Sequence, residues 1–478
     1  MTRTNGAHWG SNTGININHF SEQKMAIKID VGKESNENGI LLKRRIKKVP
    51  PLLRNNENNK GEYDPKVVSL GPYHHGKPEL QLVESLKPMV ARLFVSDSHN
   101  DMEEFYEKVL LMVDDMRSCY DEGSTITYSD DEFAKMMLLD GCFVLGMIES
   151  FDSSDHKPDR RAKYDDVMTH LGVLVWYSIN SDMVFLLENQ LPFQVLELLM
   201  SLKYKDDEGM KRIDAFLEVQ IPWDLPFQIK KETKGSGCEN QPLHILQLFW
   251  KKLLLDQYAD EFNQPLHHIN SLRSSQRVKH KNGRGKVNVK DYIHSFRSVT
   301  ELKAKGIHFR PIDSKSQKAI KFESFWFSGL LELPPFLVTP KTKTMLSNII
   351  AYEMWSDNSN SLAITSYIGF LKSLIDHPDD VKELRSKHIL FNRLGSDEEV
   401  ANIFKEISTF AAEDYGIYGD VTQSIEEHYK SMVKTWMAEF FHKHFSSPWT
   451  VVASIAASFM VVSSFLQSYF TMFPRSTN

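Results

Sequence analysis

Apolar residues spaced three or four positions apart recur along most of the chain, which is the pattern of helices that bury one face. Clear examples are Phe105, Val109 and Val113, and the later series that runs from Ile425 to Phe441. This periodicity predicts a mainly α fold. It also predicts helices over residues 82–94, 132–150, 181–202, 242–255, 344–355, 362–376 and 397–412.

Extended segments are short and few. β-Branched and aromatic residues gather between turn signals at residues 67–70, 307–309 and 319–333, which predicts strands there but no large sheet. No repeat of fixed period is present, so a solenoid is not expected. We therefore predict a multi-helix globular domain with a few short strands over residues 41–446, after a disordered tail over residues 1–40 that is rich in Asn, Gly and Ser.

The C-terminal region contains one long uncharged stretch. The 25 residues from Trp449 to Phe473 include no Asp, Glu, Lys, Arg or His. As a helix they would extend about 37 Å, more than the ~30 Å hydrocarbon core of a bilayer. A buried core helix is the alternative, but the length favours a single transmembrane helix over residues 447–473, followed by a short tail over residues 474–478.

The flanking sequence predicts how this anchor is oriented. Residues 1–40 contain no apolar core of a signal peptide, so insertion would follow translation, as in a tail-anchored protein. Lys430, Lys434 and Lys443 lie before the stretch and Arg475 lies after it, which places the large domain in the cytosol. Small residues four positions apart, such as Ala453 and Ala457, would allow two such helices to pair as a homo-dimer.

Composition and charge narrow the range of partners. The chain is 41% hydrophobic and 25% charged, with a net charge of −6, so most of it should fold in water without a general attraction to nucleic acid. A flexible insertion near residues 270–290 is basic and has no acidic residue. It could contact anionic lipid or nucleic acid, but it lacks interleaved aromatic residues, and a solvated loop is the favoured interpretation. We expect no nucleic-acid partner.

The sequence contains no motif of a known catalytic class. G-x-S-x-G, G-x-x-x-x-G-K-[ST], H-E-x-x-H and G-x-G-x-x-G are all missing. The three cysteines, Cys119, Cys142 and Cys238, are widely spaced and predict neither a disulfide framework nor a zinc site. Cys119 and Cys142 lie in apolar helical stretches, where a buried thiol acts as a small hydrophobe. We expect no catalysis, no cofactor and no metal.

Two polar segments are candidates for chemistry. Adjacent histidines at positions 74 and 75 lie in a turn-rich segment, but a metal would require further ligands, and structural hydrogen bonding is favoured. Residues 188–190 interrupt the apolar run MVFLLENQLPFQVL, and burying them without partners would be costly. A buried structural network is the preferred interpretation of these three residues.

Seven blocks occur in order at residues 49–76, 136–145, 182–199, 300–309, 348–353, 367–404 and 447–457. Together they resemble the plant family called domain of unknown function 247, or the UPF0481 type. The sequence departs from the usual family pattern at residues 331–339, where LELPPFLVT replaces a more acidic stretch. The positions that match family motifs are Gly71, Pro72, Tyr73, His74, His75, Gly76, Glu188, Asn189, Gln190 and Pro192.

The resemblance implies a mostly helical domain with a C-terminal membrane helix and no assigned catalytic activity. Some members of the family are implicated in plant reproduction, including self-incompatibility recognition in grasses. Three hypotheses follow. The first is a membrane-tethered protein that binds the bilayer and an unknown protein partner; the second is an enzyme of unfamiliar type that uses the His74 or Glu188 region. The third is a recognition determinant presented outside the cell.

Overall fold

A computed structural model describes most of the chain after its N-terminal tail. The described residues are 45–151, 163–221, 242–258, 297–312, 320–326, 328–355, 362–409, 415–430 and 448–472. The predicted tail at 1–40, the basic insertion near 270–290 and the residues 474–478 lie outside them. Within the described residues the protein is mainly helical, as the sequence predicted.

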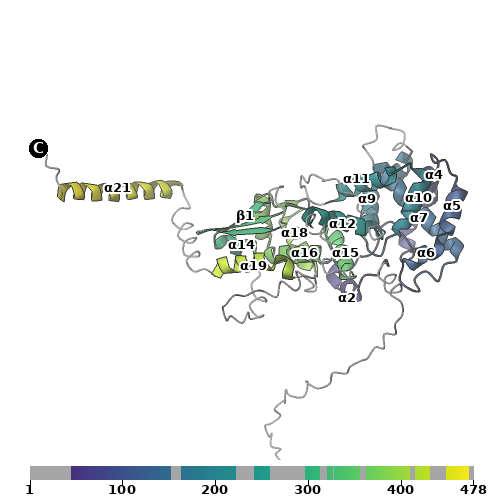
Figure 1. Ribbon diagram of the computed structural model, residues 1–478, viewed down its shortest axis with the longest axis horizontal. Coiled ribbons are helices and arrows are strands. Elements are labelled where there is room, and N and C mark those ends of the chain that lie inside the picture. Colours follow the sequence, from purple (N-terminus) through teal and green to yellow (C-terminus); the bar gives the residue numbers. More distant parts are fainter. Residues whose placement is uncertain are drawn as a thin grey trace, which may run out of the picture. The chain divides into compact units, whose positions relative to one another are not determined.

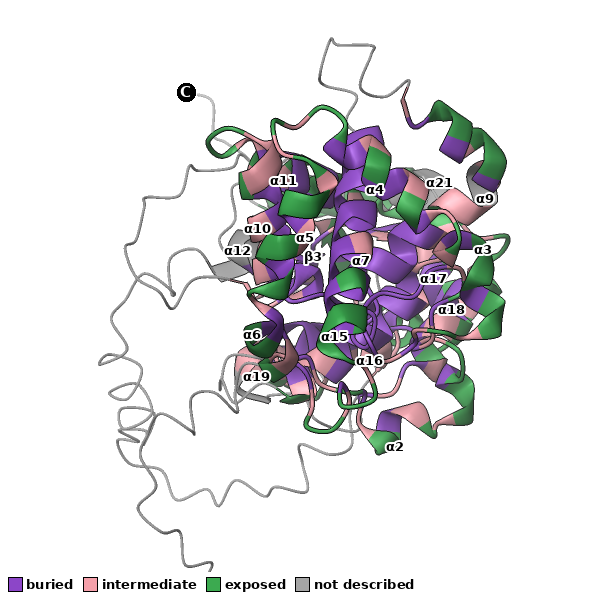
Figure 2. Ribbon diagram, turned by 90° about the vertical axis from the view of Figure 1, so that its right-hand side faces the viewer, coloured by how far each residue is buried: buried purple, intermediate pink, exposed green. Residues whose placement is uncertain are grey.

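Helix α7 (Asp130–Phe151) is the central element of the N-terminal helices, and Figure 2 shows it buried along most of its length. It begins with a capping box in which Ser129 and Glu132 exchange hydrogen bonds. Gly141 lets Leu199 and Val195 approach the helix backbone closely. The helices that pack on α7 are α4 (Lys87–Val95), α5 (Met102–Leu110), α6 (Val113–Ser118), α10 (Phe193–Lys203) and α11 (Glu208–Gln220).

The second half of the chain combines helices with two small sheets. Strands β1 (Ile307–Pro311) and β3 (Gly329–Leu333) pair in parallel, and β2 (Lys321–Ser324) pairs with β3 in antiparallel. Strand β4 (Phe336–Val338) pairs in parallel with β5 (Leu390–Asn392). The helices of this half are α12 (Ile245–Tyr258), α14 (Val299–Ala304), α15 (Thr342–Trp355), α16 (Ala363–Leu374), α17 (Pro378–Ser386), α18 (Asp397–Glu406) and α19 (Tyr415–Lys430).

Most of the predicted helices are present, but three predicted stretches are divided. The stretch predicted at 82–94 divides into α3 (Gln81–Glu84) and α4. The helix predicted at 181–202 is wrong as a single element, because α9 (Asp165–Val184) ends before Glu188 and α10 begins after Pro192. The pattern from Phe105 to Met116 likewise divides into α5 and α6. The remaining short helices are α2 (Pro51–Arg54), η2 (Glu57–Asn59) and η3 (Pro78–Leu80).

The strand predictions were partly correct. Strands β1, β2 and β3 lie where the sequence predicted them, whereas β4 and β5 were not predicted. The strand predicted at 67–70 is wrong, because no strand forms there. Val68 and Leu70 are buried and Val67 is partly buried, but the backbone N–H groups of Val67 and Val68 donate to the Asp182 side chain instead of to a neighbouring strand.

The C-terminal helix α21 (Pro448–Met472) covers nearly the same residues as the predicted membrane helix. Its described large apolar side chains, among them Ile455, Phe459 and Phe465, are exposed. Within the part of the chain that the structure describes, no helix is both long enough and apolar enough to cross a membrane.

Candidate functional site

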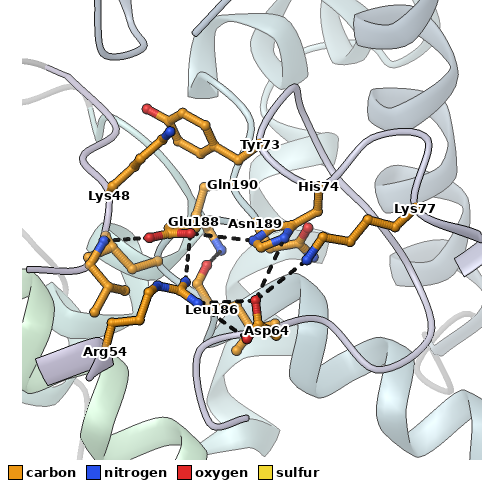
Figure 3. Close-up of polar contacts among 12 residues, drawn as sticks. Lys48, Arg54, Asp64, Tyr73, His74, Lys77, Leu186, Glu188, Asn189 and Gln190 are labelled. Carbon is orange, nitrogen blue, oxygen red and sulfur yellow. Dashed lines mark hydrogen bonds and ion pairs between the residues drawn. The ribbon is translucent and has the colours of Figure 1, made fainter. Parts of the chain in front are cut away.

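The segment 46–76 runs in largely irregular conformation and brings the two predicted polar motifs together. A segment without strand partners must satisfy its buried backbone N–H groups elsewhere. Here side chains from α7, from the end of α9 and from the turn after it accept those hydrogen bonds. We call these contacts and the residues that make them the polar cluster; Figure 3 shows the part around Glu188.

Glu188 holds the start of this segment. Its carboxylate accepts hydrogen bonds from the Val49 backbone N–H at 2.7 Å and from the Arg54 guanidinium at 2.7 Å. Arg54 also contacts Asp64, which lies 3.6 Å from the Lys77 ammonium. Glu188 is buried, so these partners offset the cost of removing its carboxylate from water.

Asn189 connects two backbone segments. Its side-chain oxygen accepts from the Leu70 N–H at 2.7 Å, and its amide nitrogen donates to the carbonyls of Val68 and Asp182, both at 3.0 Å. All three polar contacts are buried. Asn189 therefore fastens the 46–76 segment to the end of α9.

Gln190 closes the turn between α9 and α10. Its amide nitrogen donates to the carbonyls of Met183 and Leu186, and its oxygen accepts from the Leu246 N–H at 3.0 Å. Together with Glu188 and Asn189, it forms the buried hydrogen-bonded network that the sequence predicted. The same network explains why one continuous helix does not form, because these side chains bind backbone groups that a helix would occupy.

The GPYHHG turn reaches the cluster through its glycine and tyrosine. Gly71 has φ of +71°, and a Cβ atom there would lie 2.7 Å from the Tyr120 hydroxyl and 3.1 Å from the Gln190 carbonyl oxygen. The Tyr73 hydroxyl donates to the Ile46 carbonyl at 2.6 Å and accepts from the Asp121 N–H. Only glycine fits the first of these positions without strain.

His74 occupies the centre of the cluster and is 3% exposed. Its ring lies between two carboxylates, with Nε2 3.6 Å from Glu188 and Nδ1 3.9 Å from Asp64. Neither nitrogen has a hydrogen-bond partner among the described residues, so the predicted structural hydrogen bonding of this histidine is not observed. Burial, together with the nearby Lys77 charge, lowers the pKa of His74 to about 4.

His75 faces a different set of groups. Its Nδ1 lies 3.6 Å from Glu84, and its ring packs edge-on against Tyr128. The two adjacent histidines therefore do not converge on one point. Across the described residues, no group of three or more His, Cys, Asp or Glu side chains is arranged to hold a metal ion.

Three further residues of the polar cluster, Lys87, Asp140 and Asp182, were not predicted from the sequence. Lys87 is fully buried and donates to the Ser69 carbonyl, to Glu84 and to Asp140. Asp140 also accepts from the Gly71 N–H at 2.8 Å. Asp140 is the only acidic residue in the apolar run MMLLDGCFVL, and this could have predicted its role. A carboxylate in such a run is expected to be buried and therefore to have a hydrogen-bond partner.

Asp182 accepts three consecutive backbone N–H groups on one carboxylate oxygen. The donors are Lys66, Val67 and Val68, at 2.9, 2.8 and 3.2 Å. Burial raises the pKa of Asp182 to about 6, and the three backbone donors limit that rise. The arrangement replaces the strand pairing that residues 67–70 lack.

A second buried carboxylate lies outside the polar cluster. Glu353 accepts hydrogen bonds from Trp250 Nε1 at 2.8 Å, from the backbone N–H groups of Ile364 and Thr365, and from the Thr365 hydroxyl. Burial raises the pKa of Glu353 to about 7, while the four donors oppose the rise. It joins α12, α15 and the start of α16.

The two described thiols resemble structural cysteines rather than nucleophiles. Burial raises the pKa of Cys119 to about 11 and raises the pKa of the fully buried Cys142 as well. A raised pKa disfavours the thiolate, which is the reactive form. Cys238 lies outside the described residues.

The fold and the polar cluster define a class of mainly helical protein in which buried polar side chains fasten an N-terminal segment to the helices. Residues 46–463 match the model of the DUF247 family, described as plant protein of unknown function. The chain therefore belongs to the DUF247 family.

Two proteins of Arabidopsis thaliana are similar to this chain over most of their length. The UPF0481 protein At3g47200 is 31% identical over 421 residues, which cover 86% of this chain and 83% of that protein. The UPF0481 protein At3g02645 is 22% identical over 473 residues, which cover 86% of this chain and 87% of that protein. No solved structure matches the chain.

Proposed function

We propose that this plant protein is a membrane-anchored interaction protein without catalysis. Its helical domain would bind another protein, and the helix α21 would hold that domain at a membrane. In this function the polar cluster has a structural role: it maintains the shape of the domain that the partner recognises.

The uncharged C-terminal stretch is the observation that carries the proposal. Helix α21 has 25 residues, and its exposed side chains include Val452, Phe459, Val462 and Phe465. Apolar area of this extent is unfavourable in water, and lipid would remove that cost. In the sequence the uncharged stretch runs from Trp449 to Phe473, one residue beyond the end of α21.

The contacts in the polar cluster support a function without catalysis. Asn189, Gln190 and Asp182 bind backbone groups, and Glu188 binds Arg54 and a backbone N–H. Side chains engaged in this way are not available to a substrate. The raised pKa values of Cys119 and Cys142 are likewise unfavourable for a nucleophile.

The charges beside the anchor favour a cytosolic domain. Lys430, Lys434 and Lys443 precede the stretch, whereas Arg475 follows it. Cytoplasmic flanks carry the excess of Lys and Arg in membrane proteins. An extracellular recognition determinant would require the opposite orientation, which a topology measurement distinguishes.

Membrane retention tests the anchor. The full chain is expressed in plant cells, and membranes are washed with alkaline carbonate, which removes peripheral proteins. We expect the wild-type chain to remain in the pellet and the variant F459D/V462D to be released. The control is L111D/I126D, which places the same charges at two exposed apolar positions of the helical domain. Retention of F459D/V462D would contradict the anchor.

Proximity labelling tests whether the anchor delivers the domain to a partner. The intact chain and the F459D/V462D variant carry the same labelling enzyme in the same cells. We expect the set of labelled proteins to differ between them, because the tether restricts which proteins the domain meets. An unchanged set of neighbours would show that the anchor does not select the partner.

A further inference from the structure

Two aromatic side chains at the tip of the β2–β3 hairpin are exposed. Phe325 is 49% exposed and Trp326 is 85% exposed. The hairpin turn is closed by a hydrogen bond from the Phe325 N–H to the Ser328 carbonyl at 2.7 Å. We call Phe325 and Trp326 the aromatic tip.

The tip lies beside the C-terminal end of α19. Ser324, the last residue of β2, shares a hydrogen bond of 2.9 Å with His428 Nδ1, and the Phe322 ring packs edge-on against His428. His428 belongs to the last turn of α19, which ends at Lys430. Figure 1 shows the sheet that contains β1 next to α19. The aromatic tip is therefore at the end of the domain from which the chain continues toward α21.

The length of the chain limits how far this end can be from the proposed anchor. Residues 431–447 separate Lys430 from Pro448. Even fully extended, that connection reaches about 60 Å, and any compact path is shorter. The proposed anchor thus keeps the end of the domain that bears the tip within about 60 Å of the start of α21, a span across which the tip can reach the bilayer surface.

Cationic side chains gather at the same end. The Arg297 guanidinium lies 3.6 Å from the centre of the Tyr429 ring, and the Lys305 ammonium lies 5.7 Å from it. Lys430 is exposed and pairs with Glu426, which also lies 3.8 Å from Arg297. Arg297 also lies 4.0 Å from the Glu301 carboxylate, so this end of the domain carries charged groups of both signs, which suit the polar headgroup region.

Tryptophan and other amphipathic rings prefer the headgroup region of a bilayer, because their apolar body and polar edge match that zone. We propose that the aromatic tip is a second membrane contact, with the Trp326 ring placed in the headgroup region of the bilayer that holds α21. This inference rests on the proposed anchor. Its consequence is a domain held by two points, and so in a fixed orientation on the membrane.

Depth-dependent fluorescence quenching tests the contact. The full chain is reconstituted in vesicles of phosphatidylcholine and phosphatidylserine, with and without phosphatidylcholine brominated on its acyl chains. The fraction of tryptophan emission that bromine quenches is compared between the wild type and W326F. We expect this fraction to fall in W326F, because a tryptophan in contact with lipid has been removed.

The control is W355F, which removes an exposed tryptophan whose Nε1 donates to the Lys48 carbonyl, away from the tip. Its quenched fraction should not fall. An unchanged or higher quenched fraction in W326F would overturn the inference while leaving the anchor intact, and would indicate that water or protein surrounds the tip. Loss of the wild-type chain from the vesicles on carbonate washing would overturn the anchor, and this inference with it.

Discussion

The carboxylate of Glu188 accepts hydrogen bonds from the Val49 N–H and from Arg54 within the polar cluster. Replacing it by alanine leaves a buried donor and a guanidinium without that partner. We expect E188A to lower the free energy of unfolding by about 2 to 4 kcal/mol, and E188Q by less, because the amide oxygen can still accept from Val49. Thermal unfolding of the purified full chain in detergent measures both.

The control for this change is E107A, which removes an exposed glutamate on α5. It should alter stability by less than about 0.5 kcal/mol, as most surface substitutions do. Equal stability of E188A and E107A would mean that Glu188 does not fasten the 46–76 segment.

His74 should make the stability of the domain depend on pH. Burial lowers the pKa of His74 to about 4, from 6.5. The unfolded chain therefore binds a proton at a higher pH than the folded chain does. The stability contribution is complete above about pH 6.5 and is lost as the pH falls toward 4, by at most about 3 kcal/mol.

Denaturant unfolding between pH 7 and pH 4.5 checks this dependence. We expect H74Q to lose less stability than the wild type over that interval, whereas H170Q, at an exposed position on α9, should follow the wild type. Parallel curves for H74Q and the wild type would contradict the assignment. Other buried groups, including His244, also titrate, so the difference between variants is the relevant quantity.

At the scale of elements, the GPYHHG turn contains two glycines with similar backbone conformations but different surroundings. Gly71 and Gly76 both have positive φ, but a Cβ atom at Gly71 would meet Tyr120 and Gln190, whereas one at Gly76 would meet nothing within 4 Å. We expect G76A to cost about 1 kcal/mol from backbone conformation alone, and G71A to cost at least about 2 kcal/mol more. Thermal unfolding separates the two, and equal costs would show that the close contact at Gly71 is unimportant.

The sequence predicted elements well where periodicity is local. The helix predicted at 132–150 matches α7 and the one at 344–355 matches α15, because each is a continuous stretch that is buried along most of its length. The predictions of a single helix at 181–202 and of a strand at 67–70 were wrong. At 67–70 the decisive contact joins Val67 to Asp182, 115 positions along the chain, and no local pattern encodes it. At 181–202 the side chains of Asn189 and Gln190 bind backbone carbonyls of α9 that a continuous helix would use.

The polar cluster was only partly predictable from the sequence. Glu188, Asn189 and Gln190 stood out because they interrupt an apolar run, and the structure shows them buried and paired. Lys87 gave no such signal, since a lysine near other polar residues predicts an exposed side chain. Its burial follows from Asp140, which approaches it only in the folded chain.

At the scale of the whole molecule, the proposed function combines a domain of defined shape with a tether. The polar cluster fastens the 46–76 segment within that domain, and α21 supplies the proposed attachment to a membrane. A protein of this kind would act by placing a recognition surface where its partner is concentrated. The orientation of the domain relative to the bilayer therefore decides which partners are accessible.

Protease protection in sealed vesicles is the most direct measurement of that claim. Full-length protein with a tag at each end is inserted into microsomes whose outer face is cytosolic, and protease is added without detergent. We expect the helical domain with its N-terminal tag to be digested while the short C-terminal fragment stays protected. A protected domain would contradict the cytosolic orientation, and digestion of both tags would contradict the membrane anchor itself.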